Sequence, residues 1–288
     1  MDIELKIKQT LKKVGLSKRD KILVALSGGK DSAVTCYLLK KFGYRIEGFH
    51  IDLQMGEYSD KCFKAVQDLC KQLEIRLHTY DIKQEMGSGM CYLRSAIQTK
   101  RSLKNCAICG VIKKWIMNKE ARRLGARKIA TGHNLDDEAQ TFLINVLKGS
   151  PGLSANSGAI SKNTRDKKFV PRIKPLFYIP EDEVRKYSEK QKLPVIYEKC
   201  PCALDSYRIQ VRKFMNTMPD KEKLNIIKNM GRIMDWRKNS ETSPRDTQRG
   251  HKNLRAGDSG EPKINYCKTC GEPARNEVCK ACELLDIR

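Results

Sequence analysis

The chain has 288 residues, of which 57 are Lys or Arg and 34 are Asp or Glu, so its formal net charge is +23. This length suits one large domain with a small appendage. No apolar run approaches the roughly eighteen residues of a membrane helix, so we expect a cytoplasmic protein with no membrane contact. The basic excess is spread along the chain, which favours a nucleic-acid partner over a merely basic surface.

The N-terminal residues, MDIELKIKQTLKKV, predict a charged amphipathic helix, not a signal peptide. The apolar run 22–26 then predicts a buried parallel strand, and residues 31–42 predict a helix. The turn between them reads Ser27, Gly28, Gly29, Lys30, Asp31, Ser32. A strand, a glycine turn and a helix direct backbone N–H groups at a phosphate, to which Lys30 adds a charge and the serines add hydroxyl donors.

The string SGGKDS lacks the spacing of a Walker loop. It resembles the pyrophosphate loop, or PP-loop, of the N-type ATP pyrophosphatases, which cleave ATP between its α and β phosphates to adenylate a carbonyl oxygen. The alternative is an ordinary glycine-rich turn, which this six-residue string behind a strand disfavours. The resemblance implies bound ATP and Mg²⁺.

Strands and helices are expected to alternate, which predicts a doubly wound parallel α/β sheet. The strands are expected at 22–26, 45–51, 75–80 and 128–131, and helices at 31–42, 60–72 and 111–123. Ligands of such sheets bind beyond the carboxyl ends of the strands. The PP-loop, His50 with Ile51, and Gly132 all follow strands, so we expect them to share one crevice, with His50 and Ile51 beside the adenine.

Twelve cysteines without a secretion signal indicate metal or redox chemistry, not disulfides. Cys36, Cys62 and Cys70 fall in probable helices and read as core residues. Cys106 and Cys109 open a helix, where the dipole stabilises thiolates. This pair could be a redox pair, half a zinc site or part of an iron–sulfur cluster, and Lys113 follows it by one turn on the same face.

Residues 130–138, ATGHNLDDE, predict a strand end, a turn and a helix start. Asp136 is read as the N-cap, and Asp137 as a functional carboxylate able to hold Mg²⁺. Residues 150–172 predict an exposed loop, and Pro180 precedes another helix. Cys200-Pro-Cys202 comes before a helix with basic residues that could be either a solvated face or a contact to tRNA phosphates: Arg208, Arg212 and Lys213.

The C-terminal end predicts a small separate unit. Residues 1–237 form the PP-loop domain with a helical C-terminal part, 238–264 a flexible linker poor in apolar residues, and 265–288 a zinc ribbon. The ribbon rests on two CxxC pairs eight residues apart, a spacing typical of structural zinc: Cys267, Cys270, Cys279 and Cys282. About twenty residues cannot bury a core, so the metal would be the core. An iron–sulfur centre is the weaker alternative.

The motifs SGGKDS, CAICG and TGHN-x-DDEAQT, in this order, resemble the tRNA 2-thiouridine synthetases. The resemblance implies a [4Fe–4S] cluster on Cys106, Cys109 and Cys200. It matches Lys113 and Asp137 to an essential lysine and aspartate, and it places Gly132 against the nucleotide. A persulfide and disulfide mechanism on Cys109 and Cys200 is the alternative. Cys202 departs from the family pattern and could compete with Cys200 as ligand, and no N-terminal zinc module is present.

The resemblance implies that ATP adenylates O2 of a uracil and that sulfur then replaces AMP at C2. The T-loop uridine is the expected target, with the wobble uridine or an anticodon-loop cytidine as alternatives. tRNA is the expected partner, the sulfur donor is a ubiquitin-like thiocarboxylate or free sulfide, and a homodimer is implied. Two other hypotheses are a PP-loop ligase acting on a small molecule and a zinc-ribbon RNA-binding module without ATP turnover.

Overall fold

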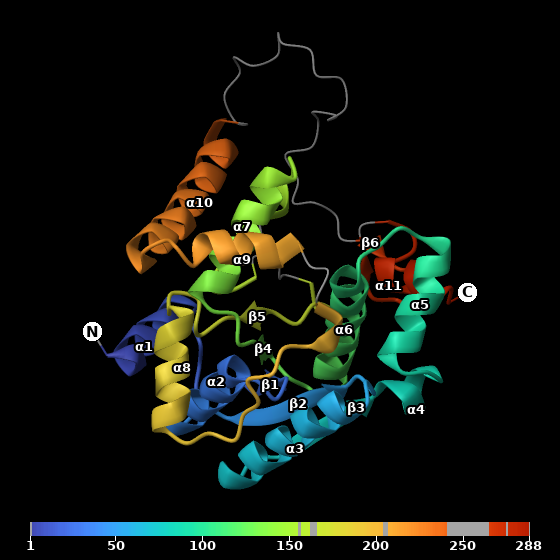
Figure 1. Ribbon diagram of the computed structural model, residues 1–288, viewed down its shortest axis with the longest axis horizontal. Helices are drawn as coiled ribbons and strands as arrows, with labels where there is room; N and C mark the ends of the chain where they lie inside the picture. Colours follow the sequence, from blue (N-terminus) through green and yellow to red (C-terminus); the bar gives the residue numbers. More distant parts are fainter. Residues whose placement is uncertain are drawn as a thin grey trace.

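A computed structural model describes residues 2–154, 157–161, 166–203, 207–240, 265–274 and 276–287. Figure 1 shows a central sheet surrounded by helices, with the C-terminal segment to one side. None of the described helices is long and apolar enough to cross a bilayer.

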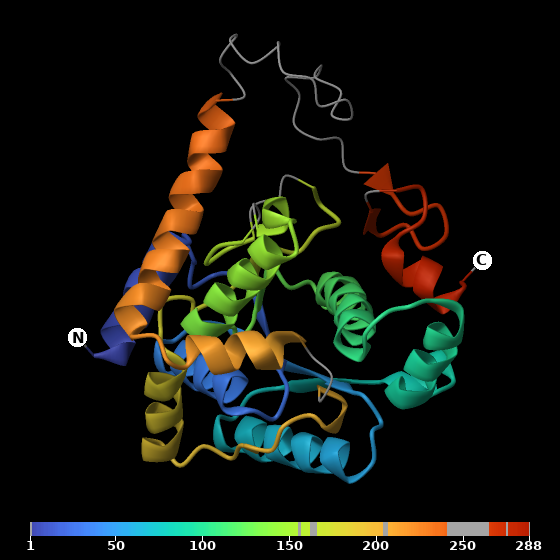
Figure 2. The same cartoon turned by 45° about the horizontal axis from the view of Figure 1, so that its top comes forward.

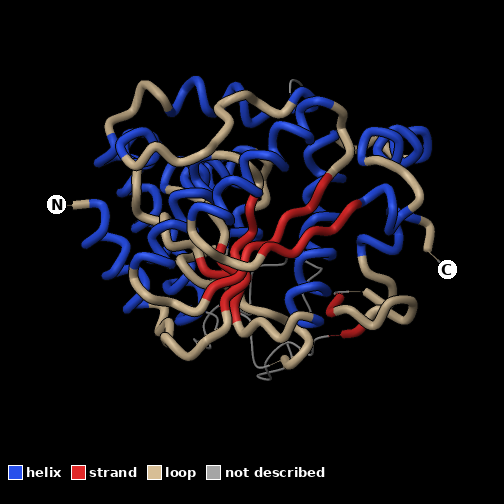
Figure 3. Tube along the Cα trace, turned by 90° about the horizontal axis from the view of Figure 1, so that it is seen from below, coloured by secondary structure: helices blue, strands red, loops and turns tan. Residues whose placement is uncertain are grey.

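Among the described residues the main sheet has five parallel strands in the order β3-β2-β1-β4-β5. The strands are β1 (Ile22–Leu26), β2 (Ile46–Asp52), β3 (Leu77–Asp81), β4 (Lys128–Ala130) and β5 (Arg172–Ile173). The order reverses beside β1, so a crevice opens at the carboxyl ends of β1 and β4. The predicted doubly wound α/β sheet is confirmed, and Figure 3 shows its strands at the centre of the molecule.

Helices cover both faces of this sheet. One face carries α1 (Ile3–Lys13), α2 (Lys30–Lys41), α3 (Glu57–Gln72) and α8 (Glu181–Lys190). The other carries α4 (Ile82–Met86), α5 (Met90–Lys100) and α6 (Asn105–Arg123). Along β1, Ile22, Val24 and Leu26 enter the first core and Leu23 the second, as the two-residue period of a strand requires.

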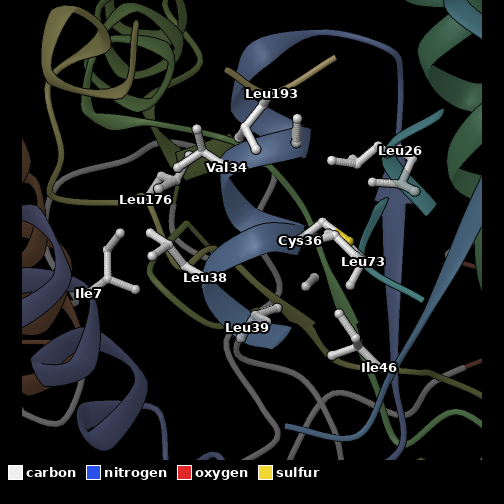
Figure 4. Close-up of a cluster of buried hydrophobic side chains, with 14 of the residues drawn as sticks. Ile7, Leu26, Val34, Cys36, Leu38, Leu39, Ile46, Leu73, Leu176 and Leu193 are labelled. Atoms are coloured by element: carbon white, nitrogen blue, oxygen red, sulfur yellow. The ribbon is translucent and has the colours of Figure 1, made fainter. Parts of the chain in front are cut away.

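The first core is continuous from the N-terminal helix to the sheet. In Figure 4 the side chains of α2 lie between Ile7 and Leu176 on one side and Leu26 and Ile46 on the other. Ile7 is fully buried, so the amphipathic N-terminal helix packs its apolar face into this core.

A third cluster joins three helices beyond the sheet: α7 (Leu135–Leu147), α9 (Tyr207–Met215) and α10 (Asp220–Ser240). Figure 2 shows α10 as a long helix beside α7. Helix α10 continues to Ser240, three residues into the segment expected to be a linker, and residues 241–264 lie outside the described part. The domain boundaries remain a prediction.

Most predicted elements agree with the structure to within about three residues at their ends, as is usual for helix and strand limits. The exception is α6, which was predicted over 111–123 and begins six residues earlier, at Asn105. No element was predicted at α4, α5 or β5. The loop expected at 150–172 contains a short 3₁₀ helix, η1 (Pro151–Ser154), and ends in β5, where Val170 is buried. A two-residue strand has no detectable period, which explains why β5 was missed.

The C-terminal residues form β6 (Asn265–Tyr266), β7 (Pro273–Ala274) and α11 (Lys280–Leu285). Strands β6 and β7 pair antiparallel, and α11 packs on α5 and α6. Figures 1 and 2 both place this segment beside α6. Leu284 enters the second core, so the small unit is docked on the large one.

Candidate active site

One cavity of about 540 Å³ opens at the carboxyl ends of the strands. It brings together most of the residues that the sequence singled out: Ser27, Asp31, Ser32, His50, Ile51, Lys113, Gly132, Asp137, Cys106, Cys109 and Cys200. These residues come from five separate segments of the chain. Gly28, Gly29 and Lys30 belong to the same loop but do not line the cavity.

The PP-loop is held by its own hydroxyl groups. The Ser27 N–H donates to Ser32 Oγ at 3.2 Å, and Ser32 Oγ donates to the Gly29 carbonyl at 2.9 Å. Gly28 has a φ of +82°, and a Cβ there would lie 2.8 Å from Cys62 Cα. Only glycine fits such a position. The loop therefore leaves the first N–H groups of α2 without helical partners, which is the arrangement that binds phosphate.

Lys30 does not line the cavity and is paired with two carboxylates. Its Nζ lies 2.9 Å from both Asp31 Oδ2 and Glu181 Oε1, and Arg212 also pairs with Glu181. Burial disfavours the ammonium, but Asp31 and Glu181 outweigh it and raise the pKa of Lys30. The charge of Lys30, which was expected to face phosphate, is therefore neutralised in this structure by Asp31 and by Glu181 of α8.

The turn after β4 packs directly on the PP-loop. A Cβ at Gly132 would lie 2.6 Å from the carbonyl carbon of Asp31 and 2.6 Å from the Ser32 nitrogen. Asn134 Nδ2 donates to Asp31 Oδ1 at 3.0 Å, which ties the two turns together. Glycine at position 132 thus permits backbone-to-backbone contact.

The expected N-cap of α7 was wrong. Asn134 caps this helix, since its Oδ1 accepts the Asp137 N–H at 3.0 Å. Asp136 is instead buried, where it pairs with Lys223 at 2.7 Å and accepts the Glu181 N–H. Asn and Asp cap helices equally well, so the sequence could not separate them.

Asp137 faces the cavity beside a cation. Burial raises its pKa, while Arg208, 3.4 Å away, acts in the opposite direction. Arg208 also donates to Thr141 at 2.7 Å. Both arginines of α9 therefore reach carboxylates at this site, and of the three basic residues considered in this helix, Lys213 is the exposed one.

The polar lining of the cavity also includes Lys114, His133 and Arg94. Burial and the nearby Arg172 and Lys174 lower the pKa of Lys114. Burial, with Lys174, lowers the pKa of His133 to about 4, so its imidazole is neutral at pH 7. The sequence placed His133 at this crevice because it follows a strand in the TGHN motif, whereas Lys114 and Arg94 were not predicted there.

His50 has one satisfied and one free ring nitrogen. Nδ1 lies 2.9 Å from the Leu26 carbonyl, and the ring stacks on Phe63 with centroids 5.6 Å apart. Because a carbonyl only accepts, Nδ1 carries the proton and Nε2 is an acceptor. Nε2 is buried and has no partner in the described residues. Burial lowers the pKa of His50, which keeps the ring neutral.

The thiols gather along one wall of the cavity. Cys106 and Cys109 lie on the first turn of α6, and Cys200 precedes the 3₁₀ helix η2 (Pro201–Ala203), which packs on α6. Burial raises the pKa of Cys200, Cys202 and Cys109 add to this, and Lys113 opposes it. Cys62, expected in the core, is buried and also contributes to this cavity.

A family model described as a PP-loop domain matches residues 1–216. The chain belongs to the PP-loop family. Within it, the chain is similar to a tRNA-5-methyluridine(54) 2-sulfurtransferase of Pyrococcus horikoshii, with 34% identity over 99% of this chain and 85% of that protein. It is also similar to the tRNA 2-thiolation protein NcsA of Haloferax volcanii, with 31% identity over 92% and 81%.

Among solved structures, the U34-tRNA thiolase NcsA from Methanococcus maripaludis, with its [4Fe–4S] cluster, superposes with a TM-score of 0.78. The two sequences are 26% identical, and the superposition covers 98% of this chain and 85% of the NcsA chain. The expected resemblance of this PP-loop protein to the tRNA 2-thiouridine synthetases is confirmed by these relatives.

The cavity residues of this PP-loop protein suit an iron–sulfur cluster. Three cysteines line one open cavity, and thiolates are the ligands that such clusters require. Lys113 and Arg94 line the same space and can offset their negative charge. Among the described residues, the ligand atoms that converge as a ready metal group are those of the C-terminal tetrad, not of these three cysteines. It is the kind and number of donors, three thiols in one cavity, that suit a cluster bound at three corners.

The C-terminal cysteines form a compact tetrad. The sulfurs of Cys267, Cys270, Cys279 and Cys282 all lie within 4.8 Å of one another. The Cys279 N–H donates to Cys267 Sγ at 3.2 Å, and the Cys282 N–H donates to Cys279 Sγ at 3.4 Å. Four convergent sulfurs with N–H donors are typical of a tetrahedral metal knuckle.

The knuckle is docked on α6 through a buried carboxylate. Glu272 is 4% exposed, pairs with Arg122 and accepts from Asn118 Nδ2 at 2.8 Å. Val111 and Trp115 of α6 pack against the cysteine cluster. Helix α6 thus presents its N-terminal thiols to the cavity and its side to the knuckle.

Proposed function

We propose that this protein is an ATP-dependent tRNA 2-sulfurtransferase. The observation that carries the proposal is the shared cavity, which unites a PP-loop, two candidate catalytic groups and three cysteines. The named activities of the Pyrococcus and Haloferax relatives support it. A small-molecule ligase or a module without ATP turnover would have no use for this set of thiols beside a nucleotide site.

ATP lies with its phosphates on the PP-loop, at Ser27 to Ser32, and its adenine beside His50 and Ile51. The free Nε2 of His50 accepts a hydrogen bond from a nucleotide donor group. Asp31 and Asp137 line the phosphate end, and each has a raised pKa because of burial. Asp31 and Asp137 would hold a Mg²⁺ ion, which would relieve this penalty and supply positive charge to the phosphates. Lys30 turns from Glu181 to the phosphates when ATP arrives.

Adenylation of the uracil O2 releases pyrophosphate. Lys113 lies in the same cavity as the thiols and neutralises charge on the activated base, a form of stabilisation that is strongest in a site shielded from water. Asp137 positions the metal ion or accepts a proton. Gly132 allows the nucleotide and the PP-loop to sit against β4. Sulfur then attacks C2 and AMP leaves.

Cys106, Cys109 and Cys200 would hold the [4Fe–4S] cluster. Bound through these three cysteines, the cluster would supply a site for sulfide. The chain's own role is to hold these thiols in the wall and to place Lys113 near Cys200. Zn²⁺ is proposed for the separate tetrad in the zinc ribbon, residues 265–288, beyond the 238–264 linker.

The T-loop uridine is the proposed target, since the relatives from Pyrococcus, Thermotoga maritima and Thermus thermophilus are named for position 54. The donor is a ubiquitin-like thiocarboxylate or free sulfide, and the enzyme is proposed to be a homodimer. A cytoplasmic location is supported by the Chlamydomonas relative, which is named cytoplasmic.

The test is an anaerobic reaction of the holoenzyme with ATP, sulfide and tRNA transcripts carrying uridine at positions 54 and 34. Nucleosides are identified by mass spectrometry after digestion, and AMP is measured alongside. The expected result is 2-thiouridine at position 54 with equimolar AMP. Lys113→Met should abolish both, whereas Lys119→Met, an exposed lysine on the same helix, should abolish neither. AMP formation with no thiolated tRNA would overturn the proposal.

A further inference from the structure

A second pair of cysteines lies beside the cavity, joined by one arginine. Arg94 Nη2 donates to Cys202 Sγ at 2.9 Å and to Cys91 Sγ at 3.1 Å. Since both sulfurs contact the same nitrogen, they lie no farther apart than the sum of these distances. Cys91 is on α5 and Cys202 on η2, so packing alone brings together thiols that are far apart in sequence.

Arg94 has an unusual environment for a buried cation. It is 6% exposed, and in the described part of the chain it donates to the Met90 carbonyl and to these two sulfurs. None of these acceptors is a carboxylate. A buried guanidinium is normally paired with an anion. Burial and the neighbouring Cys202 raise the pKa of Cys91, and Arg94 acts in the opposite direction. Arg94 is therefore placed to stabilise negative charge that develops on either sulfur.

The two thiols differ in access. Cys91 is exposed at the surface, whereas Cys202 and Arg94 line the cavity that contains Cys109 and Cys200. The Cys202 carbonyl also accepts from Asn105 Nδ2 at 3.5 Å, so the segment is held against the start of α6. The pair therefore lies between the protein surface and the cavity in which the proposed sulfur transfer takes place.

We propose that Cys91 and Cys202 form a redox pair that takes sulfane sulfur from a persulfide and releases hydrosulfide into the cavity. This deepens the proposed function, on which it rests for the use made of the hydrosulfide. The donor class is a low-molecular-weight or protein persulfide, and the pair is reset by a dithiol reductant.

The chemistry balances in two exchanges. The Cys91 sulfur attacks the outer sulfur of the persulfide, which forms a persulfide on Cys91 and releases the donor as a thiol. The Cys202 sulfur then attacks Cys91 Sγ, a disulfide forms, and the outer sulfur leaves as hydrosulfide with the released proton. The two thiols lose two electrons and the sulfane sulfur gains them. Arg94 aligns both sulfurs and stabilises the leaving anion.

The test gives the anaerobic holoenzyme glutathione persulfide, without ATP, tRNA or reductant, and traps released hydrosulfide with a bimane reagent. About one hydrosulfide per chain is expected, because each chain has one such pair. Peptide mapping should find a Cys91–Cys202 disulfide in the wild type. Cys91→Ser and Cys202→Ser should each lower release at least about tenfold.

The matched control is Cys70→Ser, which alters a buried thiol that does not line the cavity and should retain release. Undiminished release in Cys91→Ser, or a disulfide that joins Cys202 to Cys200 or Cys109 in place of Cys91, would overturn the inference. Thiolation of tRNA by the wild type with free sulfide reports separately on the proposed function, because free sulfide does not need the pair.

Discussion

The two cysteine-rich regions of this protein are built in opposite ways. In the knuckle, four sulfurs lie within 4.8 Å of one another, and three of the four cysteines are buried. In the cavity, Cys106, Cys109 and Cys200 are partly or fully exposed and spread along one wall. The four sulfurs of the knuckle can supply every ligand of a metal ion, whereas the three cysteines of the cavity leave room for another molecule.

This difference separates a structural centre from a reactive one. A metal with four protein ligands cannot bind substrate and serves to hold the chain together, while a site with fewer protein ligands keeps an open position. Both regions meet on α6, which carries two cavity cysteines at its first turn and contacts the knuckle through Trp115 and Arg122. The knuckle therefore supports the helix on which the reactive thiols sit.

The strongest test of this division is the substitution of one cysteine by serine in each region. Cys200→Ser should remove iron, retain zinc and lower tRNA thiolation by more than about 100-fold, because even residues behind metal ligands change activity 10–100-fold. Cys282→Ser should remove zinc and retain iron. Metal content and thiolation are measured on anaerobically purified protein. Loss of both metals in either variant would contradict the separation.

Gly132→Ala tests how far the cavity depends on backbone packing. The new Cβ would meet the backbone of Asp31 and Ser32 at 2.6 Å, so the PP-loop must shift. Overpacking of this kind costs about 1–3 kcal/mol. We expect a fall of that size in the free energy of unfolding and roughly tenfold weaker ATP binding, as about 1.4 kcal/mol would give. Urea unfolding and calorimetry measure the two effects.

Gly231→Ala is the control for this change. Nothing lies within 4 Å of a Cβ at Gly231, which is on α10 away from the PP-loop, so ATP affinity should be unchanged. Equal ATP affinity in Gly132→Ala and wild type would show that the tight contact is not needed for nucleotide binding.

Glu272→Gln probes the junction between the two regions. The substitution keeps the size of the side chain but removes the charge opposite Arg122, which is about one-third exposed. Because solvent screens this pair in part, we expect the docking of the knuckle to weaken by about 1–2 kcal/mol. Hydrogen exchange should rise in α11 and in the adjacent face of α6, with zinc content unchanged.

Glu277→Gln provides the comparison on the same small unit. Glu277 pairs with Lys268 on the surface, where both side chains are largely exposed, so its loss should leave hydrogen exchange unaltered. Similar exchange in the two variants would mean that the buried pair does not anchor the knuckle.

The smallest effect concerns pH and the cavity wall. Burial lowers the folded-state pKa of His50 below its usual 6.5, so the unfolded chain takes up a proton first as pH falls. Stability contributed by the neutral ring is present above pH 6.5 and is lost as pH falls toward the folded pKa. His50→Asn should therefore flatten the dependence of unfolding free energy on pH below 6.5, by at most about 1.4 kcal/mol per pH unit. Parallel curves for the two proteins would contradict the neutral buried ring.

The features that could be predicted from the sequence are those that depend on neighbouring residues. Strand and helix periods predicted the α/β sheet, and the string SGGKDS predicted the phosphate turn before α2. The two CxxC pairs predicted the knuckle tetrad. Such patterns are local, because backbone period, glycine turns and ligand spacing act within a few residues.

The folded arrangement of the chain shows which distant groups meet. It turned Lys30 toward Glu181 of α8, gave the cap of α7 to Asn134, and placed Arg94 of the unpredicted α5 against Cys202. It also docked Glu272 on α6. These contacts join residues many positions apart, and their partners are fixed by how buried faces pack, which no single segment encodes.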